Sequence, residues 1–278
     1  MIRLAIRCRS SDAEAALAEL LELAPGGVEE VTAPNGQNGV VEYAIYGAPG
    51  ELPEIGALQA AAGDALVEVR SDRVPDDWEE RWKRFYFPVL IDGRLYVRPP
   101  WERPAERGGV IEVVIDPGRA FGTGTHATTN MCLELLLGLR SHKGRSFCDL
   151  GCGSGVLAIA ASKLGFEPVL AIDSEQAAID ETMRNARINY VDLETVRLDL
   201  RTGQIPTADV VTANLTAKLL EQLARAWVAS PDRPKTLIAS GFLTVEADHL
   251  RTQLEGAGIE TVKELIRGEW AAVLGQVP

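Results

Sequence analysis

The residues best suited to chemistry in this 278-residue chain lie between positions 149 and 173. Gly151, Gly153 and Gly155 follow an apolar stretch and precede a helix-like run, which predicts a strand, a glycine-rich loop and a helix. The next apolar run ends at Asp173, which would place a carboxylate at the tip of the following parallel strand. A loop that brings backbone close to a ligand, with a carboxylate that can hold two ribose hydroxyls, indicates an adenosine-cofactor site.

The spacing of the glycines distinguishes between cofactors. Dinucleotide-binding loops carry G-x-G-x-x-G, whereas this loop reads G-x-G-x-G with Asp149 two residues before its first glycine. That spacing is typical of class I S-adenosylmethionine (SAM) methyltransferases, whose cofactor presents an amino acid moiety and a sulfonium instead of a phosphate. The motif therefore favours a methyltransferase over a dehydrogenase, and the remaining interpretation is a tight turn in an ordinary strand-helix unit.

A second loop, rich in glycine and threonine, precedes this segment. A turn at residues 116–118 leads into a loop that contains Phe121, Gly122, Thr123 and His126, and an apolar helix follows from about Thr129. A loop that runs into a helix N-terminus can serve a ligand, although this one lacks the lysine of a P-loop. Without further support this loop does not define a site.

The elements that must position these residues alternate between strand and helix from residue 147 onward. Strands are expected at 196–200 and 209–215, and an antiparallel pair at 261–274 closes the chain. This order predicts an α/β fold with a Rossmann-like, mostly parallel sheet that ends in an antiparallel strand. The ligand of such a sheet lies at the carboxyl ends of the strands, where Asp173, Asp199 and Asn214 fall in the sequence.

The first 75 residues follow a different pattern. Their order βαββαβ predicts an N-terminal α+β domain of the ferredoxin-like kind, with a small antiparallel sheet. Trp78, Trp82 and Phe85 then share one face of an expected helix, which either packs between domains or grips a partner. We therefore predict a domain at residues 1–75, a linker helix at 76–88 and a SAM-binding methyltransferase domain at 89–278.

Negative charge is concentrated in the first quarter of the chain. The formal net charge is −12, and residues 1–70 hold eleven acidic residues against four arginines, a net −7. Such a surface repels a phosphate backbone and attracts a basic polypeptide, so we expect a basic protein partner and no direct binding of nucleic acid. Solubility would also explain the charge.

Several classes of protein are disfavoured by what the sequence lacks. No stretch approaches the roughly eighteen apolar residues of a membrane span, and the N-terminus is too short and too charged for a secretion signal, so we expect a cytoplasmic protein. The four cysteines form no C-x-x-C pair and only three histidines accompany them, so we expect neither a metal site nor disulfides. Cys148 and Cys152 are expected to be buried thiols.

From end to end the chain resembles the ribosomal protein L11 methyltransferases. The phrase F-G-T-G-T-H-A-T-T at residues 121–129 carries most of the resemblance. It is joined by Asp116-Pro117-Gly118, Asp149 to Gly155, Asp173, Ala213-Asn214-Leu215, Ser240-Gly241, Glu269-Trp270, Asp77-Trp78 and Pro99 to Glu102. The resemblance implies a SAM-dependent protein N-methyltransferase that modifies lysine side chains and the α-amino group of L11, with an N-terminal domain that recognises the protein substrate.

The resemblance also implies which residues contact SAM. They are Thr129, Gly151, Asp173 and Asn214, and the predicted cofactor site further includes Asp149, Gly153, Gly155, Phe121, Gly122 and Thr123. Two stretches depart from the family pattern, Ser174-Glu175-Gln176 and the Leu-Thr-Ala that follows Asn214. These departures concern the fit of the acceptor more than the binding of SAM.

Asn214 is the predicted catalytic residue. Its side-chain carbonyl can accept a hydrogen bond from the acceptor amine and direct the nitrogen lone pair at the methyl group. The other interpretation is an asparagine that ends a strand. Thr129 either caps its helix or contacts the methionine end of SAM, which we favour, whereas His126 is either a base or a residue that fixes the loop backbone.

Three functions remain under consideration. The first is methylation of L11, and the second is SAM-dependent methylation of another protein lysine or of a small molecule. The acidic N-terminal domain argues against a small molecule. The third is a non-catalytic SAM-binding module associated with the ribosome, which an intact Asn214 argues against.

Overall fold

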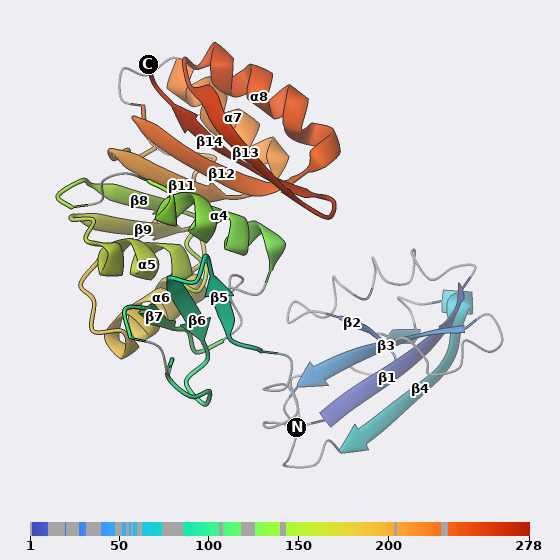
Figure 1. Ribbon diagram of the computed structural model, residues 1–278. Helices are drawn as coiled ribbons and strands as arrows, with labels where there is room; N and C mark the ends of the chain where they lie inside the picture. Colours follow the sequence, from blue (N-terminus) through green and yellow to red (C-terminus); the bar gives the residue numbers. More distant parts are fainter. Residues whose placement is uncertain are drawn as a thin grey trace. The chain divides into compact units, whose positions relative to one another are not determined.

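The structure is a computed structural model in which residues 1–85 and residues 86–278 form two compact units (Figure 1). It describes residues 2–10, 20, 28–31, 40–47, 52–53, 56, 58–59, 63–73, 86–105, 108–117, 126–139, 143–202, 205–228 and 233–278. Phe121, Gly122 and Thr123 of the predicted cofactor site lie outside the described residues, as do positions 76–85 of the predicted linker helix. The partition at residues 75 and 88 stays a prediction.

The first unit contains a four-stranded antiparallel sheet. Its strands are β1 (Ile2–Arg9), β2 (Glu29–Val31), β3 (Val40–Gly47) and β4 (Leu66–Arg73), in the order β2-β3-β1-β4, and a short 3-10 helix η2 (Gly63–Ala65) precedes β4. Alternate residues of β1 face the core, where Ile6 packs near Leu20 and Leu58. Strand order and direction agree with a ferredoxin-like unit. Because most of the residues expected in its helices lie outside the described ranges, the complete unit stays a prediction.

The second unit is built on a seven-stranded sheet in the order β10-β9-β8-β11-β12-β14-β13. All neighbouring pairs are parallel except the two made by β14. The strands are β8 (Phe147–Leu150), β9 (Val169–Asp173), β10 (Glu194–Arg197), β11 (Val210–Asn214), β12 (Thr236–Leu243), β13 (Glu260–Arg267) and β14 (Trp270–Gln276). The predicted Rossmann-like sheet with one antiparallel strand is thus confirmed.

The strand predicted at 196–200 begins and ends earlier than expected. Leu198 still donates its amide to Asp173 O at 2.9 Å, but Asp199 then starts a turn. Asp199 Oδ1 accepts the Arg201 amide at 3.0 Å, and the Thr202 amide donates to Asp199 O at 3.1 Å. A short acidic side chain that bonds the backbone two residues ahead competes with strand pairing, so the strand ends at Arg197.

Helices cover both faces of this sheet (Figure 1). The helices are α4 (Ala127–Leu137), α5 (Val156–Leu164), α6 (Gln176–Ile188), α7 (Ala217–Val228), η4 (Thr244–Glu246) and α8 (Ala247–Gly256). One core cluster joins α4, α5 and α6 to the sheet through residues such as Phe147, and a second joins α7 and α8 through Cys148 and Leu150. Successive strand residues point to opposite faces, which explains why β8 is buried along its whole length.

A smaller three-stranded sheet adjoins α4, α5 and α6 in the order β5-β6-β7. Its strands are β5 (Val89–Ile91), which the sequence analysis did not predict, β6 (Leu95–Arg98) and β7 (Ile111–Val114). The strand β7 lies at one edge of this sheet and leads to Asp116. Among the described helices, none combines the length and the apolar character that crossing a membrane requires.

Candidate active site

A cavity of about 820 Å³ lies at the carboxyl ends of β8, β9 and β11. The strands β8 and β11 are neighbours, yet α5 follows β8 onto one face of the sheet and α7 follows β11 onto the other. Such a switch in chain direction opens a crevice at the strand ends, where ligands of α/β sheets bind. The wall is formed by Thr129, residues 151–153, Val156, Leu157, residues 173–175, Ala178, residues 198–201, residues 214–216, Lys218, Leu219 and Gln222.

The glycine loop needs its glycines for both conformation and space. Gly151, Gly153 and Gly155 all have positive φ angles, a region that side chains other than glycine rarely adopt. A Cβ atom on Gly151 would lie 2.5 Å from Leu215 Cδ2, so a side chain there would also collide with the segment after β11. The loop therefore exposes backbone to the cavity, and Gly155 becomes the N-cap of α5.

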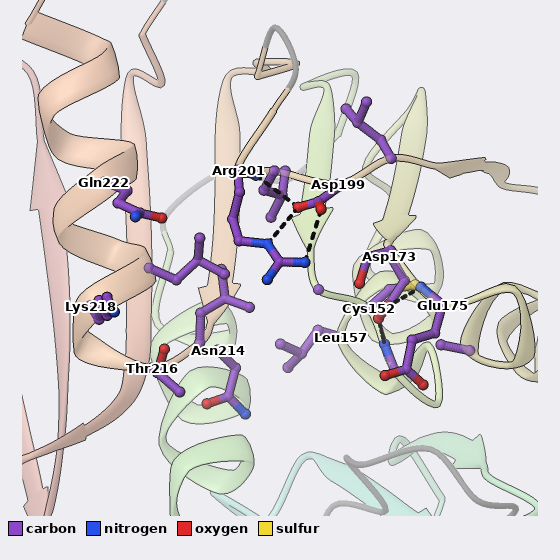
Figure 2. A pocket seen from close by; sticks show the side chains of 18 of the residues that line it. Cys152, Leu157, Asp173, Glu175, Asp199, Arg201, Asn214, Thr216, Lys218 and Gln222 are labelled. Atoms are coloured by element: carbon purple, nitrogen blue, oxygen red, sulfur yellow. Dashed lines mark hydrogen bonds and ion pairs between the residues drawn. The ribbon is translucent and has the colours of Figure 1, made fainter. Parts of the chain in front are cut away.

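Asp173 ends β9 on the cavity wall, and its carboxylate is held by two backbone amides. Gly153 donates its N–H to Oδ2 and Glu175 donates its N–H to Oδ1, both at 3.0 Å. Each carboxylate oxygen can accept more than one hydrogen bond, so both keep capacity for a ligand. Fixed in this way, Asp173 can accept hydrogen bonds from a pair of neighbouring hydroxyls (Figure 2).

Asn214 lies at the end of β11, two strands from Asp173, with β8 between them. Its Nδ2 donates to Thr129 Oγ1 at 3.3 Å, and Thr129, in the first turn of α4, is itself buried. One of the two amide N–H groups is engaged by Thr129, and the carbonyl oxygen is a group that Asn214 can offer to a ligand. Thr129 and Asn214, which are distant in sequence, thus meet at one wall of the cavity.

Of the predicted cofactor residues that the structure describes, two do not line the cavity. Asp149 lies behind the glycine loop with no exposed surface, and Gly155 contacts α6 through Thr182. Thr212 donates its hydroxyl to Asp149 Oδ1 at 2.7 Å, whereas Asp149 Oδ2 has no hydrogen-bond partner within the described part of the chain. A buried carboxylate oxygen without a partner is costly when the carboxyl group is charged.

His126 has a structural role at the start of α4. It is the N-cap residue, with Nδ1 accepting the Thr128 amide at 3.4 Å and lying 2.8 Å from Thr128 Oγ1. Its ring also packs edge-on against Trp270, with the ring centroids 5.1 Å apart. His126 is not among the residues that line the cavity. These contacts favour the interpretation in which it fixes the backbone at the end of the glycine-threonine loop.

Several lining residues were missed by the sequence analysis. Arg201 forms a two-pronged ion pair with Asp199, with both N···O distances at 2.9 Å, on the cavity wall (Figure 2). Lys218 and Gln222 enter from α7 one helical turn apart, a spacing that could have been recognised had that helix been predicted. Leucines at positions 198, 200, 215 and 219 supply apolar surface suited to an aromatic base.

Comparison with known proteins assigns the chain to a family. Residues 53–278 match the family model described as ribosomal protein L11 methyltransferase (PrmA). The chain belongs to this family. S-adenosylmethionine is therefore its methyl donor, and the resemblance seen in the sequence is confirmed.

Individual members of the L11 methyltransferase family agree with this assignment. The protein is 33% identical to ribosomal protein L11 methyltransferase of Clostridium botulinum (strain Eklund 17B / Type B) over 232 residues, which are 82% of this chain and 72% of that protein. The corresponding protein of Alkaliphilus metalliredigens (strain QYMF) is 37% identical over 231 residues, 81% of this chain and 70% of the relative. A crystal structure of ribosomal protein L11 methylase from Lactobacillus delbrueckii subsp. bulgaricus superposes with a TM-score of 0.63 at 25% identity, covering 69% of this chain and 99% of that one.

The cysteines of this family member are inert thiols. All four are buried and free, and the expected burial of Cys148 and Cys152 is confirmed. Burial, reinforced by the Asp149 carboxylate, raises the pKa of Cys148 to about 12, and the same two causes raise that of Cys152. Although Cys152 lines the cavity, its sulfur is not a nucleophile at neutral pH.

The buried Asp149 predicts a pH-dependent stability. Burial, with a smaller contribution from the Asp173 carboxylate, raises the pKa of Asp149 from 3.8 to about 7. Between these values the unfolded chain releases the proton while the folded protein retains it, so the free energy of unfolding should fall as pH rises through this window. The loss should be on the order of a few kcal/mol. It can be measured by urea denaturation of the SAM-free protein at several pH values.

The matched control is Asp149→Asn, which keeps an oxygen for the Thr212 hydroxyl but does not titrate. In the variant, the free energy of unfolding should no longer show the decrease that Asp149 causes. The variant should therefore gain stability relative to the parent protein as pH rises from about 4 to about 8. Parallel pH profiles for the two proteins would contradict the assigned protonation of Asp149.

Proposed function

We propose that this protein transfers methyl groups from SAM to amino groups of ribosomal protein L11, both lysine side chains and the α-amino group. The observation that carries the proposal is the pairing of Asp173 and Asn214 across one cavity, a hydroxyl-binding carboxylate on one side and a hydrogen-bond-accepting amide on the other. The relatives named as L11 methyltransferases support the choice of substrate. The proposal places the protein in the cytoplasm, and its overall charge of −12 disfavours direct binding of nucleic acid.

The cofactor site is proposed to divide the cavity between a polar and an apolar part. Asp173 would hold the two ribose hydroxyls, and the leucine side chains at positions 198, 200, 215 and 219 would pack against adenine. The glycine loop would lie along the amino acid moiety, with the buried Asp149 behind it. When bound, SAM supplies a methyl group on a sulfonium, which is activated for in-line displacement.

Asn214 is proposed to prepare the acceptor. An amine attacks only when it is neutral, so the protein must align it and allow its proton to leave to water. Asn214 Oδ1 would accept a hydrogen bond from the amine N–H and thereby direct the lone pair toward the methyl group. Thr129 Oγ1 accepts from Asn214 Nδ2 and so keeps the carbonyl oxygen in place. This arrangement argues against a non-catalytic SAM-binding module.

The first unit is proposed to recognise the basic protein substrate. Within its described residues, Arg3 and Arg7 pair with Glu42, and Arg7 and Arg70 pair with Glu68. Among the residues of this unit that the structure describes, Glu42 and Glu68 thus engage three of the four arginines of residues 1–70. The remaining acids give this unit a negative charge that a basic polypeptide would complement.

Removal of this unit should separate cofactor binding from substrate binding. A shortened chain that begins at Asp76 should bind SAM yet fail to methylate L11. The complete protein should lose affinity for L11 as salt rises, because exposed charges are screened over a Debye length of about 8 Å at physiological ionic strength. Calorimetry with SAM and methylation assays with L11 test both points. Methylation of L11 by the shortened chain at the full rate would overturn this role and leave the acidity as a solubility feature.

An unbiased labelling experiment tests the function itself. The protein is incubated with methyl-labelled SAM and a ribosomal extract whose proteins are not already methylated, and the products are separated into protein, RNA and small-molecule fractions. We expect one principal labelled protein band, identified as L11. A different labelled protein would favour another lysine substrate, label in small molecules would favour the alternative enzyme, and SAM binding without any label would favour the non-catalytic module.

A further inference from the structure

Helix α6 carries a row of buried polar side chains that the reaction described above does not use. Thr182, Asn185 and the C-cap residue Asn189 follow one another along one side of the helix, and at most 5% of each residue is exposed. A buried polar group is costly unless it forms hydrogen bonds. The partners of this row therefore indicate what it stabilises.

Asn185 connects two segments that are far apart in the sequence. Its Nδ2 donates to Ser154 O in the glycine loop at 2.9 Å. Its Oδ1 accepts the backbone amide of Asp116, just after β7, also at 2.9 Å. Both polar atoms of the side chain are thus used, one on each segment.

The strand β7 needs such partners because it lies at the edge of its sheet. The amides of Ile111 and Ile115 donate to Arg94 O and Arg98 O, at 2.8 and 2.9 Å, whereas the amide and the carbonyl of Val114 face away from β6. There Asn189 Oδ1 accepts the Val114 amide at 2.8 Å, and Asn189 Nδ2 donates to Val114 O at 2.6 Å. The asparagines of α6 therefore satisfy the strand edge as another strand would.

The same helix packs tightly against the glycine loop. Thr182 Oγ1 donates to Gly153 O at 3.1 Å, and a Cβ atom on Gly155 would lie 2.9 Å from Thr182. The side chain of Thr182 forms hydrogen bonds only with the glycine loop, and that of Asn189 only with β7 and with its own helix. Of the three side chains, Asn185 is the one that forms hydrogen bonds with both the loop and the chain after β7.

We propose that Asn185 is a positioning residue for cofactor binding, which fixes the glycine loop against the chain segment after β7 by bonding Ser154 O and the Asp116 amide. This inference rests on one part of the proposed function, namely that SAM binds against the glycine loop. Loss of the Asn185 bonds lets the loop backbone move, and the alignment of Gly151 and Gly153 along the cavity is lost with it.

The test compares two buried asparagines, Asn185 and Asn189. Asn185→Asp keeps an acceptor for the Asp116 amide but cannot donate to Ser154 O, while Asn189→Asp keeps an acceptor for the Val114 amide and cannot donate to Val114 O. In the complete protein, Asn185→Asp should raise the Kd and the KM for SAM about tenfold and leave kcat at saturating SAM within about twofold. Asn189→Asp should lower the melting temperature by about as much as Asn185→Asp does, but it should leave the Kd for SAM unchanged.

A second measurement needs no cofactor. Hydrogen exchange of the SAM-free protein should show faster exchange at the Gly155 amide in Asn185→Asp, which loses the bond to Ser154 O, and at the amides of both Asp116 and Gly155 in Asn185→Ala, which loses both bonds. Equal effects of the two asparagine variants on SAM affinity, or wild-type exchange in the glycine loop of the Asn185 variant, would overturn the inference. If the parent protein itself bound no SAM, the proposed function would fail, and the exchange data would decide the role of Asn185 separately.

Discussion

Replacement of Asn214 by alanine is expected to lower kcat on the order of 100-fold while changing the affinity for SAM only slightly. The reason is that Asn214 Oδ1 is proposed to contact the acceptor amine, so that its contribution is made mainly in the transition state. Steady-state kinetics with L11 and calorimetric titration with SAM give the two quantities.

Thr129→Val provides the matched control for this change. It removes the hydroxyl that accepts from Asn214 Nδ2 at 3.3 Å but leaves the Asn214 carbonyl in the protein. We expect kcat to fall by a smaller factor, about tenfold, because the carbonyl is less well oriented rather than absent. Should Asn214→Ala reduce SAM affinity and turnover by the same factor, Asn214 would be a cofactor ligand and not the residue that aligns the amine.

Replacement of Asp173 by alanine is expected to weaken SAM binding by at least about two orders of magnitude. Two charge-assisted hydrogen bonds to the ribose are each worth roughly 1.5 to 3 kcal/mol, and each 1.4 kcal/mol corresponds to about a factor of ten. Calorimetric titration of the folded variant measures the change.

Another acid on the same cavity wall serves for comparison. Asp199 is paired with Arg201 through both carboxylate oxygens, and neither Asp199 nor Arg201 is buried. Asp199→Ala should therefore weaken SAM binding much less than Asp173→Ala. Unchanged affinity in a folded Asp173→Ala protein would remove the assignment of the ribose site.

Much of the catalytic unit could be predicted from the sequence because its signals are local. Glycines at alternate positions between a strand and a helix, with Asp173 at the end of the next apolar run, specify the loop and its neighbour by short-range sterics and hydrophobic periodicity. The regular alternation of strands and helices then indicates the parallel sheet, which brings Thr129, Asp173 and Asn214 to one cavity.

What could not be predicted depends on tertiary contacts. Thr182, Asn185 and Asn189 have helical spacing in the sequence, but nothing local shows that this polar face is buried or that it bonds β7 and the glycine loop. The position of Asp149 behind the loop could not be predicted either, because the placement of a side chain within a buried strand is set by packing on both faces. Strand β5, only three residues long, has too little periodicity to be recognised.

The most direct test of the account is mass spectrometry of purified L11 after incubation with SAM and this protein. We expect the intact mass of L11 to increase in whole methyl steps, with fragmentation locating the methyl groups on lysine side chains and the α-amino group, and with no increase when the enzyme carries Asp173→Ala at a SAM concentration that saturates only the parent protein. An L11 mass that stays unchanged while the parent protein binds SAM, or methyl groups located on side chains other than amines, would contradict the account.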